Sequence, residues 1–364
     1  MKNLKMVLDF AKEALEHSST HSINFDELRA GKANIKVFGV GGAGCNAITW
    51  LFNKGISGAT IYGVNTDALH LSITKSDEKI LIGKELTRGL GCGGYPTKGR
   101  EAAKESLTEL KKAATGADMV FVLAGMGGGT GTGAVPVVAQ LAKESGAVVI
   151  GVVTMPFECE KARHDKAEFG LQELSEVVDT VIVIDNNRLV DIAGNLPMEQ
   201  AFAVANELVS TMIKGIVETI TLPSLINLDY ADVSAIMKNG DVAVIGVGES
   251  DTTARVDEAV RQALTHPLLD VDYKGATGAL IHITCGPDFK LEEFSGVGEL
   301  VTENISPDAQ VIIGARINKD FANKVRVITI MTGVRSPYVL GKQRYREEAQ
   351  PSREMSDLGI EIFK

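Results

Sequence analysis

The sequence predicts an α/β protein in which a larger domain with a parallel sheet is joined by a long central helix to a smaller α/β domain with a four-stranded sheet. From Asn34 onward, short apolar runs alternate with helical patterns, as in parallel sheets that are covered by helices on both faces. Over about residues 197–221, apolar residues recur with the period of a helix. A second alternating series after Pro223 predicts the smaller domain.

The strands expected in the larger domain are short, continuous apolar segments. They are Ile35–Phe38, Thr60–Val64, Asp118–Ala124, Ala147–Val153 and Thr180–Ile184. Helices are expected at Ala47–Phe52 and at about 134–143, each after a glycine-rich loop.

The central helix has recognisable ends. Asn195 is a suitable cap, Pro197 suits the first turn, and Pro223 stops the helix. Beyond it, strands are expected at Val242–Val247, Ala279–Thr284, Gln310–Ala315 and Val325–Met331, with helices at Thr252–Thr265 and Leu291–Asn304. The predicted organisation is an N-terminal extension (1–32), a first domain (33–197), the central helix (198–222), a second domain (223–336) and a flexible tail (337–364).

Composition limits the partners. The net charge of −10, from 37 Lys and Arg against 47 Asp and Glu, argues against a nucleic-acid partner. A phosphate ligand must therefore be held by backbone N–H groups and helix ends, with a metal ion neutralising part of its charge. The six histidines show no metal-ligand spacing, so no side-chain metal site is expected. The four cysteines form no CxxC pair, which favours a reducing, cytoplasmic compartment, and no apolar run is long enough for a transmembrane anchor.

Both ends of the chain leave two interpretations open. Leu4, Leu8, Ala11 and Leu15 recur at helical spacing among lysines, so the extension forms either a membrane-surface helix or a helix that packs on its own domain or on a neighbour. The tail ends in an apolar cluster at 358–363. This cluster is either a motif that docks to partner proteins or part of a tail that folds back on the body.

The first glycine-rich loop, Gly39–Gly44, follows a strand and opens a helix. Its GxGxxG spacing is typical of a dinucleotide site, with Asp67 in the position of the acid that binds the ribose. Taken alone, this loop predicts a nicotinamide-dependent oxidoreductase.

The second loop, Gly125–Gly133, has six glycines in nine residues and also lies between a strand and a helix. It lacks the lysine of a Walker A motif. Since so many glycines cost backbone entropy, a concavity of N–H groups around an anion is the natural requirement. Two such loops predict a site for a chain of phosphates, which a nicotinamide enzyme does not need. A third loop, Gly89–Pro96, at another expected strand–helix junction, is either a switch that reorders around a terminal phosphate or an ordinary connection.

Five segments, in order, resemble the FtsZ family of tubulin-like GTPases. They are Gly41–Asn46, Asn65–Ala68, Gly127–Gly133, Thr154–Phe157 and Asn227–Val233. The resemblance covers about residues 33–335. It implies the tubulin/FtsZ-like fold, with a Rossmann-like GTPase domain followed by the central helix and an activation domain. It also implies a protein that binds GTP or GDP with Mg²⁺, hydrolyses GTP and polymerises head-to-tail into the ring that divides prokaryotic cells.

The same resemblance implies the residues of the site. Those near the α- and β-phosphates are Gly41, Gly42, Ala43, Gly127, Gly128, Gly129, Thr130, Gly131 and Thr132; those near the γ-phosphate are Asp67, Ala68, Cys92 and Gly93. Pro156 belongs to the nucleotide site, Glu160 and Arg163 lie near the ribose and phosphates, and Asn46, Asn186, Phe202 and Asn206 surround guanine, with Phe202 stacked on it. Asn227, Asp229 and Asp232 form the catalytic loop that completes the neighbouring subunit's site.

Two departures from the family pattern bear on the nucleotide. The family usually has Asp where this chain has Asn206, so the preference for guanine is expected to survive in weaker form. The family's Glu-Gly-x-x-Arg is shortened here to Glu160-Lys161-Ala162-Arg163, which puts the reach of Arg163 in question.

The length of the central helix separates the two parts of this site. Phe202 lies near its start, and Asp229 and Asp232 follow its end. The intervening helix of about 19 residues spans roughly 28 Å. One chain therefore cannot bring both parts to one nucleotide, and head-to-tail stacking is expected to carry the aspartates to the next subunit's γ-phosphate.

Other functions fit parts of the sequence. A tubulin-like paralogue for cell shape or plasmid partition would carry the same nucleotide motifs, and a scaffold filament would bind GTP with negligible turnover. The oxidoreductase fits only the first loop. Within the FtsZ interpretation, the tail is expected to bind division or membrane-tether proteins, and the chain is expected to concentrate at the division site.

Overall fold

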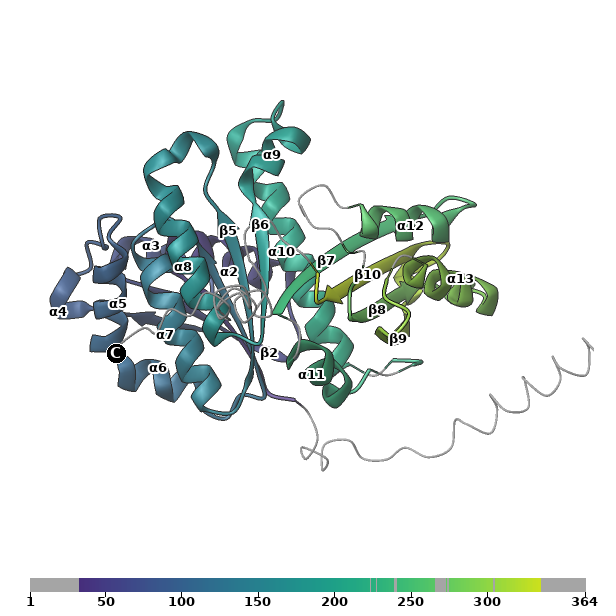
Figure 1. The fold of residues 1–364 in the computed structure, drawn as a ribbon, viewed down its shortest axis with the longest axis horizontal. Coiled ribbons are helices and arrows are strands. Elements are labelled where there is room, and N and C mark those ends of the chain that lie inside the picture. Colours follow the sequence, from purple (N-terminus) through teal and green to yellow (C-terminus); the bar gives the residue numbers. More distant parts are fainter. Residues whose placement is uncertain are drawn as a thin grey trace, which may run out of the picture. The chain divides into compact units, whose positions relative to one another are not determined.

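The computed structural model describes residues 33–334 except 223, 227, 239–240, 266–272, 274 and 304 (Figure 1). The expected N-terminal extension (1–32), the tail (337–364) and the predicted catalytic Asn227 lie outside the described residues. Their interpretations therefore stay predictions, as do the domain boundaries drawn from the sequence.

The larger sheet consists of six parallel strands. These are β1 (Ile35–Val40), β2 (Ala59–Asn65), β3 (Glu78–Leu81), β4 (Met119–Gly125), β5 (Val148–Met155) and β6 (Thr180–Asp185), in the spatial order β3-β2-β1-β4-β5-β6. The α/β class and the parallel sheet are confirmed. β3 has no counterpart among the predicted strands, because it is a short edge strand with only two apolar residues.

Helices cover both faces of this sheet. The helices before the central one are α2 (Gly41–Lys54), α3 (Ala68–Ile73), α4 (Lys84–Thr87), α5 (Pro96–Glu105), α6 (Leu107–Ala114), α7 (Thr130–Glu144), α8 (His164–Val177) and α9 (Asn186–Ala193), with a 3₁₀ helix, η1 (Glu158–Arg163). One face packs on α2 and the central helix, and the other packs on α5 to α8. In β1, Val37 belongs to one core cluster and Phe38 to the other, so the strand is buried on both faces. Its one charged residue, Lys36, is also buried, and its Nζ donates to the Ala113 and Thr115 oxygens.

The central helix is α10 (Met198–Thr221), whose 24 residues span about 36 Å. The expectation that Asn195 caps it is wrong. The cap position is occupied by Pro197, which has no side-chain donor or acceptor to contribute. α2 and α7 begin at Gly41 and Thr130, earlier than expected, because the glycine-rich segments themselves form the first turns of these helices.

The smaller domain has the predicted four-stranded sheet. Its strands are β7 (Asp241–Ser250), β8 (Gly278–Cys285), β9 (Gln310–Ile317) and β10 (Val325–Thr332), in the order β7-β10-β8-β9, and its helices are α11 (Tyr230–Lys238), α12 (Arg255–Leu264), α13 (Leu291–Thr302) and the 3₁₀ helix η2 (Lys319–Phe321). β10 is antiparallel to both of its neighbours, and β8 is parallel to β9. β7 also pairs with β6 at two residues, so ten strands form one continuous sheet.

Two glycines of β7 allow α12 to lie directly on the strand. A Cβ atom added to Gly246 would lie 1.6 Å from the backbone oxygen of Ala263, and one added to Gly248 would lie 1.9 Å from that of Ala259. Since backbone atoms cannot rotate out of the way, only glycine permits this approach.

We predict that Gly248→Ala lowers the free energy of unfolding by about 1–3 kcal/mol, because the new methyl group displaces α12. Urea unfolding of the purified chain measures this change. Gly296→Ala is the matched control: its Cβ would meet only Val256, at 3.8 Å, within α13. Since alanine restricts the unfolded chain, the control should be neutral or stabilising. Equal unfolding midpoints for the two variants would contradict the proposed packing constraint.

Candidate functional site

The first two glycine-rich loops lie side by side at the carboxyl edge of the larger sheet. β1 and β4 are parallel neighbours with Val40 opposite Ala124, and each continues into its loop at this edge. The loops touch through backbone atoms: a Cβ added to Gly41 would lie 2.7 Å from the backbone nitrogen of Gly131. Gly41 also has a φ of +72°, a conformation that other residues rarely adopt. The glycines therefore meet a geometric requirement, which the sequence predicted.

The two helices that follow these loops present open N-termini. Among the described residues, no side chain caps α2 or α7, and neither helix has an acidic residue in its first turn. The first N–H groups of a helix have no partner within it and carry partial positive charge, so they suit an anion. The buried Thr132 Oγ1 also has no hydrogen-bond partner in the described part of the chain. These features fit a polyphosphate between the two loops.

The third loop joins α4 to α5, so its expected position at a strand–helix junction is wrong; the short α4 follows β3 and was not predicted. The loop is nevertheless held at the same edge of the sheet. The Ala68 N–H donates to the Gly89 oxygen at 3.0 Å, and the Gly91 N–H donates to the Thr66 oxygen at 3.2 Å. These bonds bring Asp67, Ala68, Cys92 and Gly93 together beside the second loop.

Thr66 connects the second and third loops. Its Oγ1 lies 2.7 Å from Thr130 Oγ1, and the Cys92 thiol donates to it at 3.4 Å. Cys92 is buried, and a Cβ added to Gly129 would lie only 2.7 Å from the Cβ of Cys92. A ligand at the second loop therefore contacts a surface whose position depends on the third.

Two lysines that the sequence analysis missed contact the third loop. Lys166 Nζ on α8 donates to the Gly94 oxygen at 2.8 Å and lies 5.7 Å from the centre of the exposed Tyr95 ring. Lys98 Nζ lies 5.6 Å from the same ring. Lys166 is more than 70 residues from the loop in sequence, so no local motif could have indicated it.

The next strands contribute the residues assigned to the ribose and the phosphates. Pro156 is buried directly after β5, and η1 carries Glu160 and Arg163, which pair at 2.5 Å. A Cβ on Gly127 would lie 2.8 Å from Arg163 Cβ. The shortened segment therefore still brings Arg163 against the second loop.

The residues assigned to the base lie on helices that begin at this same edge. Phe202 and Asn206 are one turn apart near the start of α10; Phe202 is partly exposed and packs edge-on against Phe157, with ring centres 5.9 Å apart. Asn186 opens α9 directly after β6. Asn46 lies on α2, which packs along α10, and its Oδ1 is 3.1 Å from His70 Nε2.

Asp229 and Asp232 lie at the opposite edge of the sheet. Between them, the Tyr230 hydroxyl donates to the Asp118 oxygen at 2.7 Å, and Asp118 directly precedes β4. The seven residues of β4 separate this point from the second loop by about 20 Å. Figure 1 shows α11 and α9 at opposite ends of β6. The structure therefore does not bring these aspartates to the glycine loops of their own chain.

Asp229 also has a structural function. Its Oδ1 accepts a hydrogen bond of 2.8 Å from the Asp232 N–H, so it caps the N-terminus of α11. Asp232 lies in the first turn of that helix, where its negative charge is favourable.

The fold and the site define a class: an α/β nucleotide-binding protein that holds phosphates with backbone N–H groups at the carboxyl edge of a parallel sheet. In the described part of the chain, no cluster of three metal-binding side chains is present. No described helix is both long and apolar enough to cross a membrane.

Comparison with known proteins identifies the family. Residues 34–194 match the model of the GTPase domain of the Tubulin/FtsZ family, and residues 241–335 match that of the FtsZ family C-terminal domain. The chain is 54% identical over 346 residues to Cell division protein FtsZ 2 of Methanocaldococcus jannaschii, covering 94% of this chain and 90% of that protein. It is 51% identical over 328 residues to FtsZ 2 of Halobacterium salinarum, covering 90% and 84%.

Comparison with solved structures finds the same fold. An empty FtsZ dimer of M. jannaschii has a TM-score of 0.80 at 51% identity, covering 85% of this chain and 90% of that one. CetZ1 of Haloferax volcanii, a GDP-bound monomer, has a TM-score of 0.73 at 23% identity, covering 87% and 100%, and shows likeness of fold alone. The chain belongs to the FtsZ family of cell-division GTPases and binds GTP and GDP. The oxidoreductase suggested by the first loop is therefore wrong.

We predict that iodoacetamide modifies Cys159 at least about a hundredfold faster than Cys45 or Cys285 in the folded chain. Cys159 is exposed, whereas burial raises the pKa of the Cys45 and Cys285 thiols to about 11. At pH 8, about three units below that value, roughly a thousandth of each buried thiol is thiolate. Mass spectrometry of the native chain measures the labelling. Cys159→Ser is the control, and rapid labelling of that variant at Cys45 would contradict the described burial.

Proposed function

We propose that this chain polymerises head-to-tail and hydrolyses GTP at the contact between subunits, in the filament that forms the division ring. The observation that carries the proposal is the placement of Asp229 and Asp232 about one sheet length from the glycine loops. A chain with this geometry holds its nucleotide at one edge and its acidic loop at the other. Stacking identical chains along that direction completes one site per contact.

In this proposal the nucleotide lies over the open N-termini of α2 and α7. The α- and β-phosphates contact the backbone of the first two loops, and the γ-phosphate reaches Asp67, Ala68, Cys92 and Gly93. Arg163 and Glu160 lie beside the ribose. Phe202, Asn206, Asn186 and Asn46 surround the guanine. The ends of α2 and α7, which no side chain of the described residues caps, support the phosphate positions.

Mg²⁺ is the expected companion of the nucleotide. Because the net charge is −10 and no lysine belongs to either phosphate loop, the phosphate charge needs a cation. Mg²⁺ is commonly held by phosphate oxygens, waters and one or two carboxylates, so a three-residue protein cluster is not required. Asp67 is the carboxylate at that end of the site. When bound, the ion neutralises charge on the transferring phosphoryl group.

Hydrolysis then depends on an oriented water molecule. Backbone N–H groups position the phosphates, but the first two glycine-rich loops contain no side chain that could act as a base. Asp232 from the next subunit is suited to orient the water, since its position in α11 is fixed by the bond from its N–H to Asp229. Asn227 would complete this loop.

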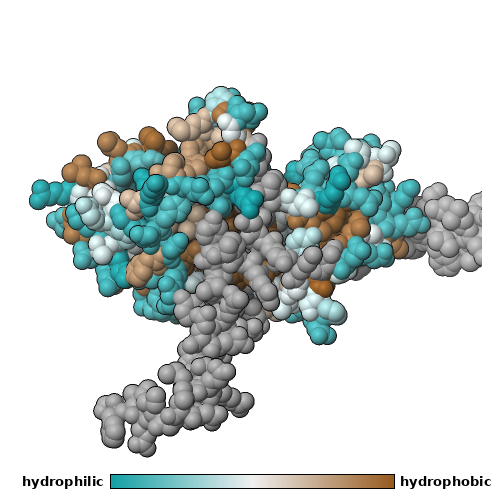
Figure 2. Space-filling view, turned by 45° about the horizontal axis from the view of Figure 1, so that its top comes forward, coloured by the Kyte–Doolittle hydropathy of each residue, from teal (hydrophilic) through white to brown (hydrophobic). Residues whose placement is uncertain are grey.

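Apolar surfaces at both edges support stacking. Leu69, Leu90 and Tyr95 are exposed around the third loop, and Leu225 and Ile317 are exposed beside the acidic loop. Figure 2 shows brown, apolar patches among the polar surface of the larger domain. Exposed apolar groups of this kind are typical of surfaces that become buried on association. The FtsZ structure of M. jannaschii, about half identical in sequence, is a dimer.

A division role is favoured over another cytoskeletal role by identity to relatives. The similarity to FtsZ proteins is 51–54%, against 23% to CetZ1. We expect the chain to be cytoplasmic and to concentrate at mid-cell, with the tail binding division or membrane-tether proteins. A fluorescent fusion that forms no mid-cell band in dividing cells would favour the paralogue for cell shape or plasmid partition.

We predict that Asp232→Ala binds GTP normally but hydrolyses it at least about a hundredfold more slowly, because the water loses its orienting group. For the unsubstituted chain, phosphate release per chain should begin above a threshold concentration, together with GTP-dependent sedimentation. Adding the variant should depress activity by more than dilution does, since it supplies defective contacts.

Asp320→Ala is the control, an exposed aspartate in η2 that should leave the rate unchanged. Asp229→Asn removes the negative charge of this residue but keeps the helix cap, because asparagine also caps a helix. Phosphate release by Asp232→Ala at the normal rate, or a rate per chain that does not vary with concentration, would refute the shared site.

We predict that Asn206→Asp binds GTP roughly fivefold more tightly, because a carboxylate accepts from both N1–H and the 2-amino group of guanine, and charged hydrogen bonds are the stronger ones. Calorimetry with GTP, inosine triphosphate and ATP measures the change. The gain should shrink with inosine triphosphate, which lacks the 2-amino group, and disappear with ATP. An equal gain for all three nucleotides would remove Asn206 from the base site.

A further inference from the structure

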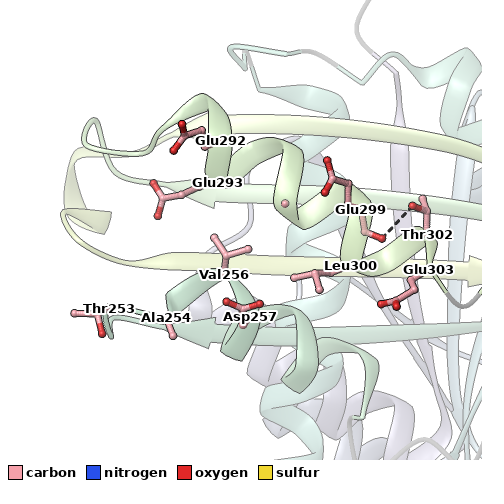
Figure 3. A pocket seen from close by; sticks show the side chains of 11 residues that line it. Thr253, Ala254, Val256, Asp257, Glu292, Glu293, Glu299, Leu300, Thr302 and Glu303 are labelled. Atoms are coloured by element: carbon pink, nitrogen blue, oxygen red, sulfur yellow. Dashed lines mark hydrogen bonds between the residues drawn. The ribbon is translucent and has the colours of Figure 1, made fainter.

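A groove of about 760 Å³ lies in the smaller domain between α12 and α13, away from the nucleotide site. Val256, Gly296 and Leu300 contribute its apolar part. Figure 3 shows Val256 and Leu300 between the two helices, with carboxylates of both helices around them. The groove therefore combines an apolar strip with an acidic border.

The border carries carboxylates that lack a cation. Of the acidic residues that line the groove, Glu293 is satisfied by Arg255, with bonds of 2.7 and 2.9 Å. Asp257, Glu292, Glu299 and Glu303 are exposed, and none of them pairs with a Lys or Arg of the described chain. The lining contains no basic residue. The groove is thus suited to a basic segment with apolar side chains.

The chain itself contains such a segment directly after the smaller domain. Residues 335–346, here called the basic segment, read Arg-Ser-Pro-Tyr-Val-Leu-Gly-Lys-Gln-Arg-Tyr-Arg. They contain four basic residues and no acidic one, with Tyr338, Val339, Leu340 and Tyr345 as apolar or aromatic groups. Residues 347–364 carry five acidic residues against two basic ones, so the positive charge is confined to the part next to the domain.

The basic segment begins at the correct end of the groove. Val334, the last described residue, is buried and lies two residues after the end of β10. The Thr277 N–H donates to the Thr332 oxygen, and the Ser306 N–H donates to the Ala276 oxygen. These bonds place the end of β10 close to the C-terminal end of α13, where Thr302 and Glu303 line the groove.

Length also permits the contact. The 12 residues of α13 span about 18 Å. The 12 residues of the basic segment reach up to about 40 Å when extended. The segment can therefore run from Val334 along the whole groove with residues to spare.

We infer that the basic segment docks in the α12/α13 groove of its own chain. Arg335, Lys342, Arg344 and Arg346 face the unpaired carboxylates, and Tyr338 and Leu340 cover Val256 and Leu300. The N-terminal extension is a poorer occupant, because residues 1–32 hold five basic and five acidic residues and so have no net charge. Tethering gives the basic segment a high effective concentration that a separate partner lacks.

Zero-length cross-linking of the full-length chain with a carbodiimide tests the occupant, since this reagent joins lysine amines to carboxylates. A GDP-bound mixture of ¹⁵N-labelled and unlabelled chains, below the assembly threshold, should give links from Lys342 to Glu299, Glu303 or Glu292 within one isotopic species. Links between a labelled and an unlabelled chain would assign the groove to a second copy. Links from Lys2, Lys5 or Lys12 would assign it to the N-terminal extension. Either result overturns the inference, and so does the absence of any link to the groove.

Tryptic cleavage after Lys342, Arg344 and Arg346 tests the charge requirement. Glu292→Lys/Glu299→Lys should be cleaved there roughly tenfold faster than the unsubstituted chain, because loss of the ion pairs releases the segment. Asp308→Lys/Asp320→Lys makes the same charge change at exposed positions of the domain outside the groove and should be cleaved at the original rate. Urea unfolding establishes that both variants remain folded. Equal cleavage of all three chains overturns the inference.

Discussion

The contact between the two glycine turns after β1 and β4 determines the nucleotide site. The strands are parallel neighbours, so their loops meet at one edge, and the backbone of Gly41 lies against that of Gly131. A side chain at this contact would separate the helices that follow. With glycine there, the open N-termini of α2 and α7 lie beside each other, and their partial charges add at the place where phosphates bind.

The acidic loop shows how one residue can serve both structure and chemistry. Asp229 caps α11, which would explain an aspartate there in any protein. Tyr230 ties the same loop to the start of β4 through Asp118. The loop is therefore held rigidly at the edge that faces away from the nucleotide. That placement links an unremarkable capping motif to the proposal of catalysis between subunits.

Much of the fold follows from patterns within single segments. Buried strands such as β4 (Met119–Gly125) are continuous apolar runs, and the regular apolar face of α10 predicted both its length and the distance between Phe202 and the aspartates. Features that depend on contacts between distant segments were not predictable in this way. β3 is half exposed and has little pattern. The third loop was placed after a strand because the single turn of α4 has no periodicity to detect. Lys166 reaches Gly94 only through the packing of α8, and the α12/α13 groove arises from two helices that begin 36 residues apart in the sequence.

The junction between β6 and β7 has a mechanical consequence. Among the described residues, two pairs join β6 to β7, whereas β7 and β10 share eight. The angle between the domains therefore depends on helix packing as well, both on α10, where Gly215 leaves room for Ile328, and on α11, which contacts β5 and β8. A ligand that shifts α10 at its Phe202 end would therefore rotate the smaller domain relative to the larger one. Few backbone hydrogen bonds between β6 and β7 would resist this rotation.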